Sequence, residues 1–252
     1  ETGMPIAIGA LVAPLIAQKP NSNQGFFGLT RLWSSVVQID NLLSEGRSDY
    51  AAVDTRQRNL HERVAAGETA DTLMLIEFDS VYTAGSRTKP EDIPDANVPV
   101  VPIDRGGSVT YHGPGQLVVY PIIKVHGRQD VVAYVRALEQ AVIDLLAEYG
   151  IAADRVEGRT GVWIVRPGQL DRKICAIGVR FSSRTTMHGL ALNVTTDLGD
   201  FDRIVPCGIR DAGVVSMRDL GVEQTLEEVA ARLVPHLEQQ LARFRAPVEE
   251  TA

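Results

Sequence analysis

The spacing of apolar residues along the chain predicts helices where these residues recur every three or four positions. One helix is predicted to begin at Ser48 or Asp49 and to end just before Gly67. A second is predicted to begin at an Asp130 cap and to end at Gly150, because aspartate caps helix starts and glycine ends helices. Their apolar faces consist of Tyr50, Val53, Leu60 and Val64, and of Val131, Val135, Leu138, Val142, Leu145 and Leu146.

A third helix and a series of strands complete the pattern. The helix is predicted to begin at Thr225, where Thr225 and Glu228 form a capping box, and to kink at Pro235. Strands are predicted at Thr72–Phe78, Val98–Ile103, Gln116–Ile123, Gly161–Val165, Ile174–Phe181 and Met187–Val194. Short turns between several of them favour antiparallel pairing. The pattern therefore predicts an α+β fold, with a mixed, mainly antiparallel sheet flanked by helices.

The composition fits a globular chain with one sizeable core. The chain has 252 residues, 44% of them hydrophobic, and a net charge of -7. This acidic balance argues against general nucleic-acid binding, because no excess of Lys and Arg is available to neutralise phosphates. Basic residues could still form a patch for an acidic partner, or could be scattered over the surface. The residues concerned are Arg172, Lys173, Arg180, Arg184, Arg203 and Arg210.

We expect one catalytic domain over residues 36–252, preceded by an N-terminal extension over residues 1–35. Residues 1–3 precede a methionine and are expected to be a cloning remnant, and the extension is expected to be partly mobile. The apolar run Ile6–Ala17 is too short to span a bilayer and follows no basic region, so no membrane anchor is expected.

Cys207 is a candidate nucleophile. It lies in the turn Pro206-Cys207-Gly208 after a short apolar run, a position from which a side chain can reach a ligand. A free cysteine is more often a small buried residue, so the turn alone leaves both interpretations open. Its thiol would need activation, since a thiol pKa of about 8.5 leaves little thiolate at pH 7. The chain has 2 cysteines and no disulfide framework, which favours a reducing cytoplasm.

Lys173 is the candidate that could activate this thiol. As an ammonium it would stabilise a thiolate, and as an amine it could remove a proton during transfer to an acceptor amine. Lys173 precedes the predicted strand Ile174–Phe181, in the same half of the chain as Cys207, and contact between the two is a hypothesis. The alternative is an ordinary exposed lysine at a strand end.

A glycine-rich run, Arg105–Gln116, joins two of the predicted strands. Gly106 and Gly107 would let backbone N–H groups approach a ligand, although a decorated β-hairpin would also explain these glycines. The sequence contains no phosphate-binding glycine loop, so nucleotide use has no support. His112 and His188 each precede a glycine at a predicted strand edge and could line a pocket. The histidines show no zinc-type spacing, and neither a metal nor a cofactor is expected.

Four motifs that follow one another along the chain resemble the lipoyl(octanoyl) transferase family. The similarity extends from about Tyr50 to the last helix. The motifs are Arg105-Gly106-Gly107-Ser108-Val109-Thr110-Tyr111-His112-Gly113-Pro114-Gly115-Gln116-Leu117, Lys173-Ile174-Cys175-Ala176-Ile177-Gly178-Val179-Arg180, His188-Gly189-Leu190-Ala191-Leu192-Asn193-Val194 and Ile204-Val205-Pro206-Cys207-Gly208-Ile209.

The resemblance implies the fold of the biotin and lipoate ligase catalytic domains. It also implies transfer of an octanoyl group from acyl carrier protein to a lysine of the lipoyl domains of 2-oxoacid dehydrogenases and of the glycine cleavage H protein. On this resemblance Cys207 forms an acyl-thioester intermediate and Lys173 adjusts its reactivity. The implied substrate pocket consists of Arg105, Gly106, Gly107, Ser108, Val109, Thr110, Tyr111, His112, Ala176, Ile177, Gly178, Gly189, Leu190 and Ala191.

The chain departs from the family pattern at Phe78-Asp79, where the family usually has His-Pro, so a contact at the edge of the pocket changes. The N-terminal extension is a second departure.

Two other functions remain open. One is an ATP-dependent lipoate or biotin ligase of the same fold. The other is a non-catalytic module that binds acylated proteins, which requires Cys207 and Lys173 to lie apart.

Overall fold

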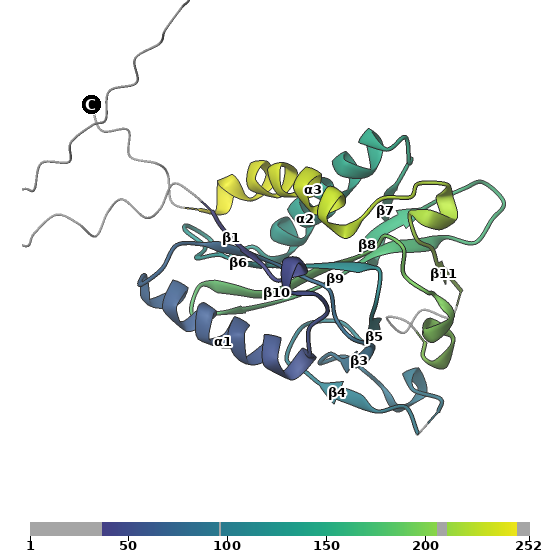
Figure 1. Ribbon diagram of the computed structural model, residues 1–252, viewed down its shortest axis with the longest axis horizontal. Coiled ribbons are helices and arrows are strands. Elements are labelled where there is room, and N and C mark those ends of the chain that lie inside the picture. The colour runs from purple at the N-terminus through teal and green to yellow at the C-terminus, as the bar shows by residue number, and fades with distance from the viewer. Residues whose placement is uncertain (1–36, 96, 206–210, 246–252) are drawn as a thin grey trace, which may run out of the picture. The chain divides into compact units, whose positions relative to one another are not determined.

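The computed structural model describes residues 37–95, 97–205 and 211–245, and its architecture is α+β, as predicted (Figure 1). The predicted N-terminal extension lies outside the described residues. The helices are α1 (Tyr50–Ala66), α2 (Val131–Glu148) and α3 (Leu226–Leu241). The strands are β1 (Gln38–Asn41), β2 (Thr72–Ile76), β3 (Val81–Ala84), β4 (Val100–Pro102), β5 (Val109–His112), β6 (Gln116–Ile122), β7 (Asp154–Val156), β8 (Arg159–Ile164), β9 (Arg172–Ser182), β10 (Thr185–Asn193) and β11 (Gly213–Val214).

The three predicted helices are confirmed, and each begins at the cap that the sequence provides. Asp49 and Asp130 each accept a hydrogen bond of 2.9 Å from the backbone N–H three residues further on. Thr225 and Glu228 form the predicted capping box of α3, and this helix continues through Pro235. None of the helices in the described part of the chain has the length and apolar character that crossing a bilayer requires.

A large sheet forms the centre of the fold, with its strands in the order β1-β2-β6-β10-β9-β8-β7 and with β11 beside β9. Neighbours in this order pair antiparallel except β1 with β2, and β11 pairs parallel with β9. A smaller sheet has the order β4-β3-β5, in which β3 is parallel to β4 and antiparallel to β5. The prediction of a mixed, mainly antiparallel sheet is therefore confirmed.

The observed strands differ from the prediction where they are short. The predicted strand Val98–Ile103 is reduced to the 3 residues of β4, and β1, β3, β5, β7 and β11 were not predicted. Elements of this length carry too few positions for a period to be recognised. The run Arg105–Gln116 contains β5, which pairs with β3 and not with β6. The hairpin interpretation of its glycines is therefore wrong, because the chain passes here from the small sheet to the large one.

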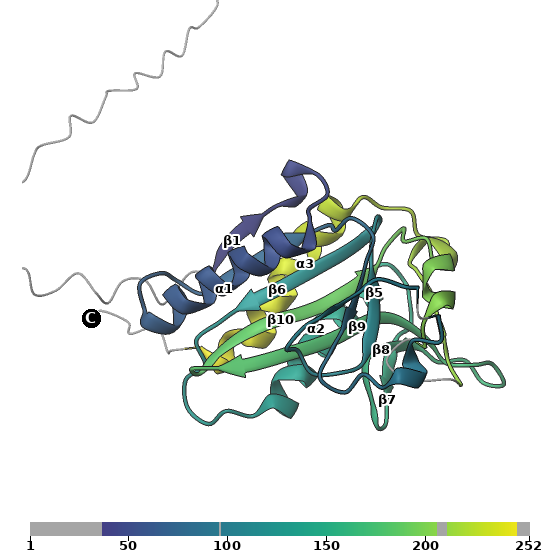
Figure 2. The same ribbon diagram turned by 90° about the horizontal axis from the view of Figure 1, so that it is seen from below.

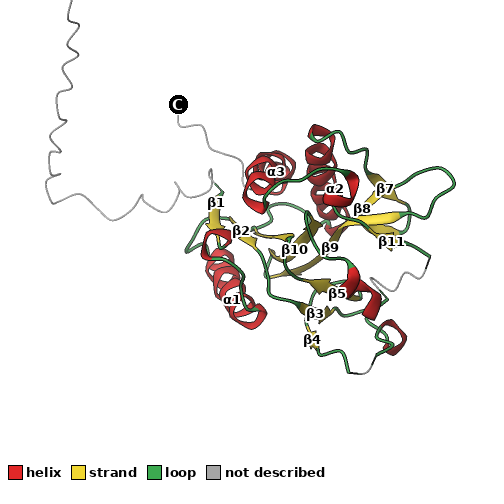
Figure 3. Ribbon diagram, turned by 45° about the vertical axis from the view of Figure 1, so that its right-hand side comes forward, coloured by secondary structure: helices red, strands yellow, loops and turns green. Residues whose placement is uncertain are grey.

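Helices cover both faces of the large sheet. In Figures 1 and 3, α1 lies on one face, and α2 and α3 lie together on the other. Figure 2 shows the sheet from the side of α1, which packs against β6 and β10. Each face has its own apolar core. The core under α2 and α3 includes Leu138, Leu190 and Leu233, and the core under α1 includes Val53 and Phe78.

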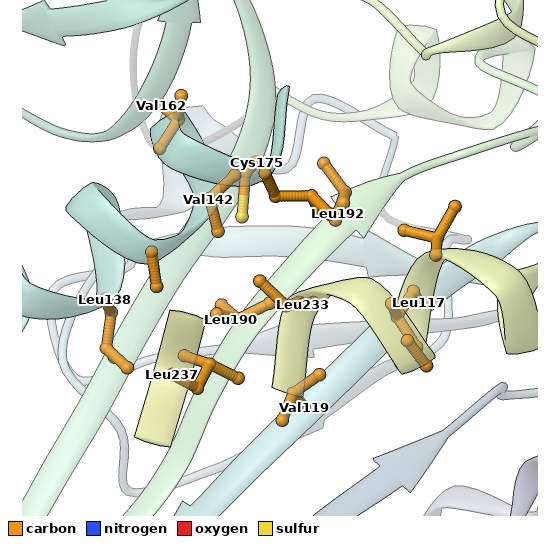
Figure 4. Packing of buried hydrophobic residues seen from close by; sticks show 14 of the residues in the cluster. Leu117, Val119, Leu138, Val142, Val162, Cys175, Leu190, Leu192, Leu233 and Leu237 are labelled. Atoms are coloured by element: carbon orange, nitrogen blue, oxygen red, sulfur yellow. The ribbon is translucent and has the colours of Figure 1, made fainter. Parts of the chain in front are cut away.

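Cys175 belongs to the core under α2. Figure 4 shows its sulfur beside Val142, among the aliphatic side chains of this core. The side chain is fully buried, and burial raises the pKa of the thiol. Cys175 is therefore a packing residue and a poor nucleophile.

One carboxylate, that of Glu139 on α2, is completely buried. It accepts hydrogen bonds from Arg136 Nη1 at 2.6 Å and from Arg155 Nε at 3.0 Å. It also accepts one from the backbone N–H of Gly161 at 3.0 Å. A carboxylate removed from water needs such partners, because its desolvation is costly. Glu139 thereby joins α2 to β7 and β8 and fixes the backbone at Gly161.

We expect Glu139→Gln to lower the free energy of unfolding by about 2 kcal/mol, because hydrogen bonds to a buried charged group are replaced by weaker ones. Urea denaturation measures this change. Glu148→Gln is the matched control, since Glu148 lies on the same helix with a side chain that is 40% exposed. Equal losses in the two variants would contradict the role given to Glu139.

Candidate active site

A pocket lies where β5 and the loop before it meet β6, β9 and β10. Its empty space is about 430 Å³, part of it open to solvent. It is lined by Arg105, Gly107, Ser108, Thr110, His112, Tyr120, Ala176, Ile177, Gly178, His188, Gly189, Leu190 and Ala191. The lining combines aliphatic side chains from β9 and β10 with polar side chains from β5, the loop before it and His188.

Most of the residues expected to form the substrate pocket lie together here, whereas Gly106, Val109 and Tyr111 do not line it. Alternation along β5 explains two of these differences. Thr110 and His112 face the pocket, and Val109 and Tyr111 point to the other side of the strand, into a separate apolar cluster with β3. Those two side chains support the pocket from behind.

Tyr120 and His188 line the pocket although they were not in the expected set. The position of His188 before a glycine at a strand edge had marked it as a possible lining residue. Tyr120 lies on a strand that is buried along its whole length, so the sequence does not indicate which of its two faces meets a ligand. The Tyr120 ring packs edge-on against the His188 ring, with 5.7 Å between the ring centres.

Two glycines face each other on neighbouring strands of the pocket. Gly178 on β9 pairs directly with Gly189 on β10, and both line the cavity. A Cβ atom on Gly189 would lie 2.1 Å from the carbonyl oxygen of Val119. A Cβ atom on Gly178 would lie 2.8 Å from Cδ of Arg105 and 2.9 Å from the carbonyl oxygen of Gly106. Any side chain at either position is therefore excluded.

Arg105 is buried beside the pocket, where its guanidinium group binds the loop that carries it. Nη1 donates to the carbonyl oxygens of Gly106 at 3.0 Å and Ser108 at 2.8 Å. Nη2 donates to the carbonyl oxygen of Thr83 at 3.1 Å and to its hydroxyl at 3.0 Å. Arg105 thus connects the loop to β3. Its positive charge also disfavours a second cation in the pocket.

His188 is held in place by its backbone and by its ring. Its φ of 58° lies in the left-handed region, and its N–H donates to Gln57 Oε1 at 3.1 Å. Its Nδ1 lies 3.3 Å from Gln57 Nε2, and its Nε2 lies 3.0 Å from Asp104 Oδ1. Asp104 also pairs with Arg58 and Arg180. Burial and the neighbouring guanidinium groups lower the pKa of His188 to about 3, so its ring is neutral.

His112 is the second buried histidine of the pocket. Burial lowers its pKa to about 4, and its Nδ1 lies 2.8 Å from Oε1 of Gln116. Phe78, which stands where histidine was expected, packs behind it. The centre of the Phe78 ring lies 5.7 Å from that of His112 and 6.2 Å from that of Tyr120. The departure from the expected motif therefore places a fully buried apolar ring behind two lining residues.

Lys173 is buried at the start of β9, with 6% of its surface exposed. Its Nζ lies 4.6 Å from the centre of the Trp163 ring on β8, close enough for a cation–π interaction. Its alkyl chain passes Gly161, where a Cβ atom would lie 3.4 Å from the lysine Cε. The alternative of an ordinary exposed lysine is therefore wrong, because β8 and β9 enclose the side chain.

Cys207 lies outside the described residues. The described chain on both sides of it is bonded to the rest of the fold. The backbone N–H of Val205 donates to the carbonyl oxygen of Asp92 at 2.8 Å. After Cys207 the chain returns to β9, where Val214 on β11 pairs with Lys173. The strand that carries the lysine is thus also the strand to which the chain returns after the cysteine.

The possible basic patch is divided by local ion pairs. Arg180 pairs with Asp104, and Arg203 Nη2 lies 3.4 Å from Asp95 Oδ2. Lys173 is buried, and Arg210 lies outside the described residues. These contacts favour separate charged residues over one cationic surface. Within residues 37–95, 97–205 and 211–245, no group of three or more His, Cys, Asp or Glu residues is arranged to hold a metal ion.

Residues 49–238 match the family described as the lipoyl protein ligase A/B catalytic domain. An octanoyltransferase of Clavibacter sepedonicus is 53% identical over 209 residues, which cover 81% of this chain and 90% of that relative. An octanoyltransferase of Thermobifida fusca is 54% identical over 181 residues, which cover 68% of this chain and 77% of that relative.

Two solved structures share the fold. A bipartite lipoate protein ligase from Thermoplasma acidophilum has a TM-score of 0.62 and 17% identity, over 82% of this chain and 85% of that one. A lipoate-protein ligase A bound with ATP has a TM-score of 0.59 and 16% identity, over 82% of this chain and 85% of that one. At this identity the likeness concerns the fold alone, and it agrees with the expected lipoate ligase architecture.

The two buried histidines predict that the fold loses stability in acid. In the unfolded chain each would take up a proton near pH 6.5, whereas the lowered pKa values of about 4 for His112 and about 3 for His188 keep both neutral in the folded chain. The unfolded chain therefore binds more protons below pH 6.5, and the free energy of unfolding falls as the pH decreases from 6.5 towards 4. Urea denaturation at a series of pH values measures this slope.

His188→Asn isolates the contribution of one ring, because asparagine tolerates the left-handed backbone and does not titrate. We expect a shallower slope in this variant between pH 6.5 and pH 4. His126→Asn, which changes an exposed histidine, is the control. The prediction is wrong if both variants keep the slope of the unmodified chain.

Proposed function

Because the chain belongs to the octanoyltransferase family of lipoyl protein ligase A/B catalytic domains, we propose that it holds an octanoyl group on Cys207 during transfer. The donor is octanoyl-acyl carrier protein. The acceptor is a lysine of the lipoyl domains of 2-oxoacid dehydrogenases or of the glycine cleavage H protein. The nucleophile must stay reduced, so we place the reaction in the cytoplasm.

The observation that carries this proposal is a buried lysine on the same strand that lines an apolar pocket. Lys173 is the second residue of β9, and Ala176 and Ile177 further along this strand line the cavity, opposite Leu190 and Ala191 of β10. These apolar lining residues suit an aliphatic chain, since each buried methylene group contributes about 0.8 kcal/mol to binding. The polar end of the acyl group would then lie among the lining residues of β5 and of the loop before it, which are Arg105, Gly107, Ser108, Thr110 and His112.

The first half of the reaction follows from the two side chains. The Cys207 thiolate attacks the carbonyl carbon of the donor thioester, so that a new carbon–sulfur bond forms and the donor sulfur leaves. The Lys173 ammonium group gives that sulfur its proton and becomes an amine. The products are octanoyl-Cys207 and free donor thiol.

The second half restores both groups. The amine of the acceptor lysine attacks the octanoyl-Cys207 carbonyl, the amide bond forms, and the cysteine sulfur leaves as a thiolate. The amine of Lys173 takes the proton that the attacking nitrogen loses. The interaction of the Lys173 ammonium with Trp163 stabilises the charged form in which each cycle begins and ends.

The two other functions have less support. A ligase would activate a free acid with ATP, but the relatives at 53% and 54% identity are octanoyltransferases, and the ATP-bound ligase shares only 16%. A binding module without activity requires Cys207 and Lys173 to lie apart. The relatives at 53% and 54% identity are named as enzymes, which favours a catalytic function.

We expect the chain to gain the mass of one octanoyl group when it is incubated with octanoyl-acyl carrier protein. Intact-mass spectrometry detects the adduct, and peptide mapping locates it on Cys207. Cys207→Ser should abolish the thioester. The matched control is Cys175→Ala, which removes the buried thiol of the core and should leave the adduct intact. An adduct that peptide mapping locates on a residue other than Cys207 would exclude this mechanism.

We expect Lys173→Arg to slow transfer to the lipoyl domain more than it slows alkylation of Cys207 by iodoacetamide. Arginine keeps the positive charge that stabilises a thiolate, but it cannot act as a base. Single-turnover transfer and the alkylation rate measure the two effects separately. Losses of equal size in both assays would contradict the role of Lys173 as the base that accepts a proton during transfer.

A further inference from the structure

A chain of buried amide groups links His112 in the pocket to the strand beside Lys173. Gln116 begins β6 and pairs with Asn193 at the end of β10. Gln116 Nε2 lies 3.0 Å from Asn193 Oδ1, and Gln116 Oε1 lies 2.8 Å from His112 Nδ1. Both amide side chains are buried, with exposed fractions of 1% for Gln116 and 4% for Asn193.

Backbone carbonyl groups at both ends fix the orientation of these amides. Asn193 Nδ2 donates to the carbonyl oxygen of Val215 at 3.1 Å, so Oδ1 of Asn193 must face Gln116. Gln116 Nε2 also donates to the carbonyl oxygen of Tyr111 at 3.3 Å, so its Oε1 must face His112. A carbonyl oxygen only accepts hydrogen bonds. Nδ1 of His112 therefore carries the proton.

This orientation defines the tautomer of His112. With the proton on Nδ1 and a neutral ring, Nε2 has a free lone pair. His112 lines the pocket, and no described residue bonds to its Nε2. The Phe78 ring packs against the imidazole and offers no competing polar atom. His112 Nε2 is thus a hydrogen-bond acceptor with a fixed orientation in the pocket wall.

The same chain of contacts reaches the strand that carries the lysine. The Val215 carbonyl accepts from Asn193, and the Val215 N–H donates to the carbonyl oxygen of Lys173 at 3.0 Å. A shift of either amide would therefore move both the His112 ring and the chain segment that follows β11. The pocket and Lys173 are connected by groups that do not themselves touch the cavity.

We propose that Gln116 and Asn193 are positioning residues that hold His112 as a neutral hydrogen-bond acceptor for an N–H group of the substrate. The inference rests on the proposed function and assigns one polar contact within it. Two N–H groups have the required chemistry. One is the amide of the thioester arm of acyl carrier protein, and the other is the amine of the acceptor lysine.

Nitrogen-15 NMR of the unmodified chain tests the tautomer without reference to activity. We expect a neutral His112 at pH 7, with the proton on Nδ1 and an unprotonated Nε2. Burial disfavours the cation, as do the charge of Arg105 and the nearby His188, and these groups lower the pKa of His112 to about 4. A proton on Nε2 at pH 7 would overturn the proposal, whether or not the chain transfers octanoyl groups.

Gln116→Glu tests the positioning role. The carboxylate still accepts from His112 but cannot donate to Asn193, and its negative charge favours the imidazolium, which has no free lone pair. We expect the pKa of His112 to rise, and transfer at pH 7 to fall at least about tenfold, with partial recovery at higher pH. Gln169→Glu introduces the same charge at an exposed position and is the control. A pH profile identical to that of the control would refute the role of Gln116.

The two half-reactions identify the N–H group. Loss confined to formation of the Cys207 adduct from octanoyl-acyl carrier protein assigns His112 to the donor arm. Loss confined to single-turnover transfer from the preloaded adduct to a lipoyl domain assigns it to the acceptor lysine. Loss in both assays means that His112 serves both groups, and loss in neither overturns the proposal. If the unmodified chain forms no adduct, the proposed function fails while the NMR result still stands.

Discussion

Polar groups that are buried around the pocket must find partners inside the protein, and the rest of the site depends on this constraint. An unpaired buried donor or acceptor costs free energy comparable to a lost hydrogen bond, and a buried charge costs more. Arg105 meets the constraint by binding four oxygen atoms, and His188 meets it through Gln57 and Asp104. The contacts with Thr83, Gln57 and Asp104 also fix a loop or a helix to the sheet.

The polar contacts reinforce the connections between the two sheets, which also touch through apolar residues such as Val81 and Val214. The three apolar clusters belong to the two faces of the large sheet and to the small sheet. Arg105 ties the loop before β5 to β3, and Gln116 ties the turn between the sheets to β10. Asp104 ties the same loop to α1 and β9. Hydrogen bonds and ion pairs therefore contribute to the relative placement of the pocket walls.

The sequence predicted those features that depend on local chemistry. Caps and apolar spacing located the three helices, and the motifs placed most lining residues in the right loops and strands. Short strands such as β3 and β5 escaped prediction, because their 4 residues carry too few positions for a period to be recognised. The hydrogen bonds of Gln116 and Gln57 could not be predicted either, since the sequence does not indicate which group a glutamine side chain contacts. The lysine on β9 was identified, but its burial against Trp163 depends on the register of β8.

The paired glycines Gly178 and Gly189 leave room for the cavity, although glycine lowers the stability of a strand. Glycine within a strand is less stable than alanine by roughly 0.5–1 kcal/mol, and here two glycines pair on central strands. Larger β-forming residues would strengthen such a ladder. A Cβ atom at either position would instead enter space held by Arg105 or by the backbone of Val119. The sheet therefore forgoes side-chain packing where the pocket needs room, and the hydrogen bonds of Arg105 hold the loop and β3 together beside this glycine pair.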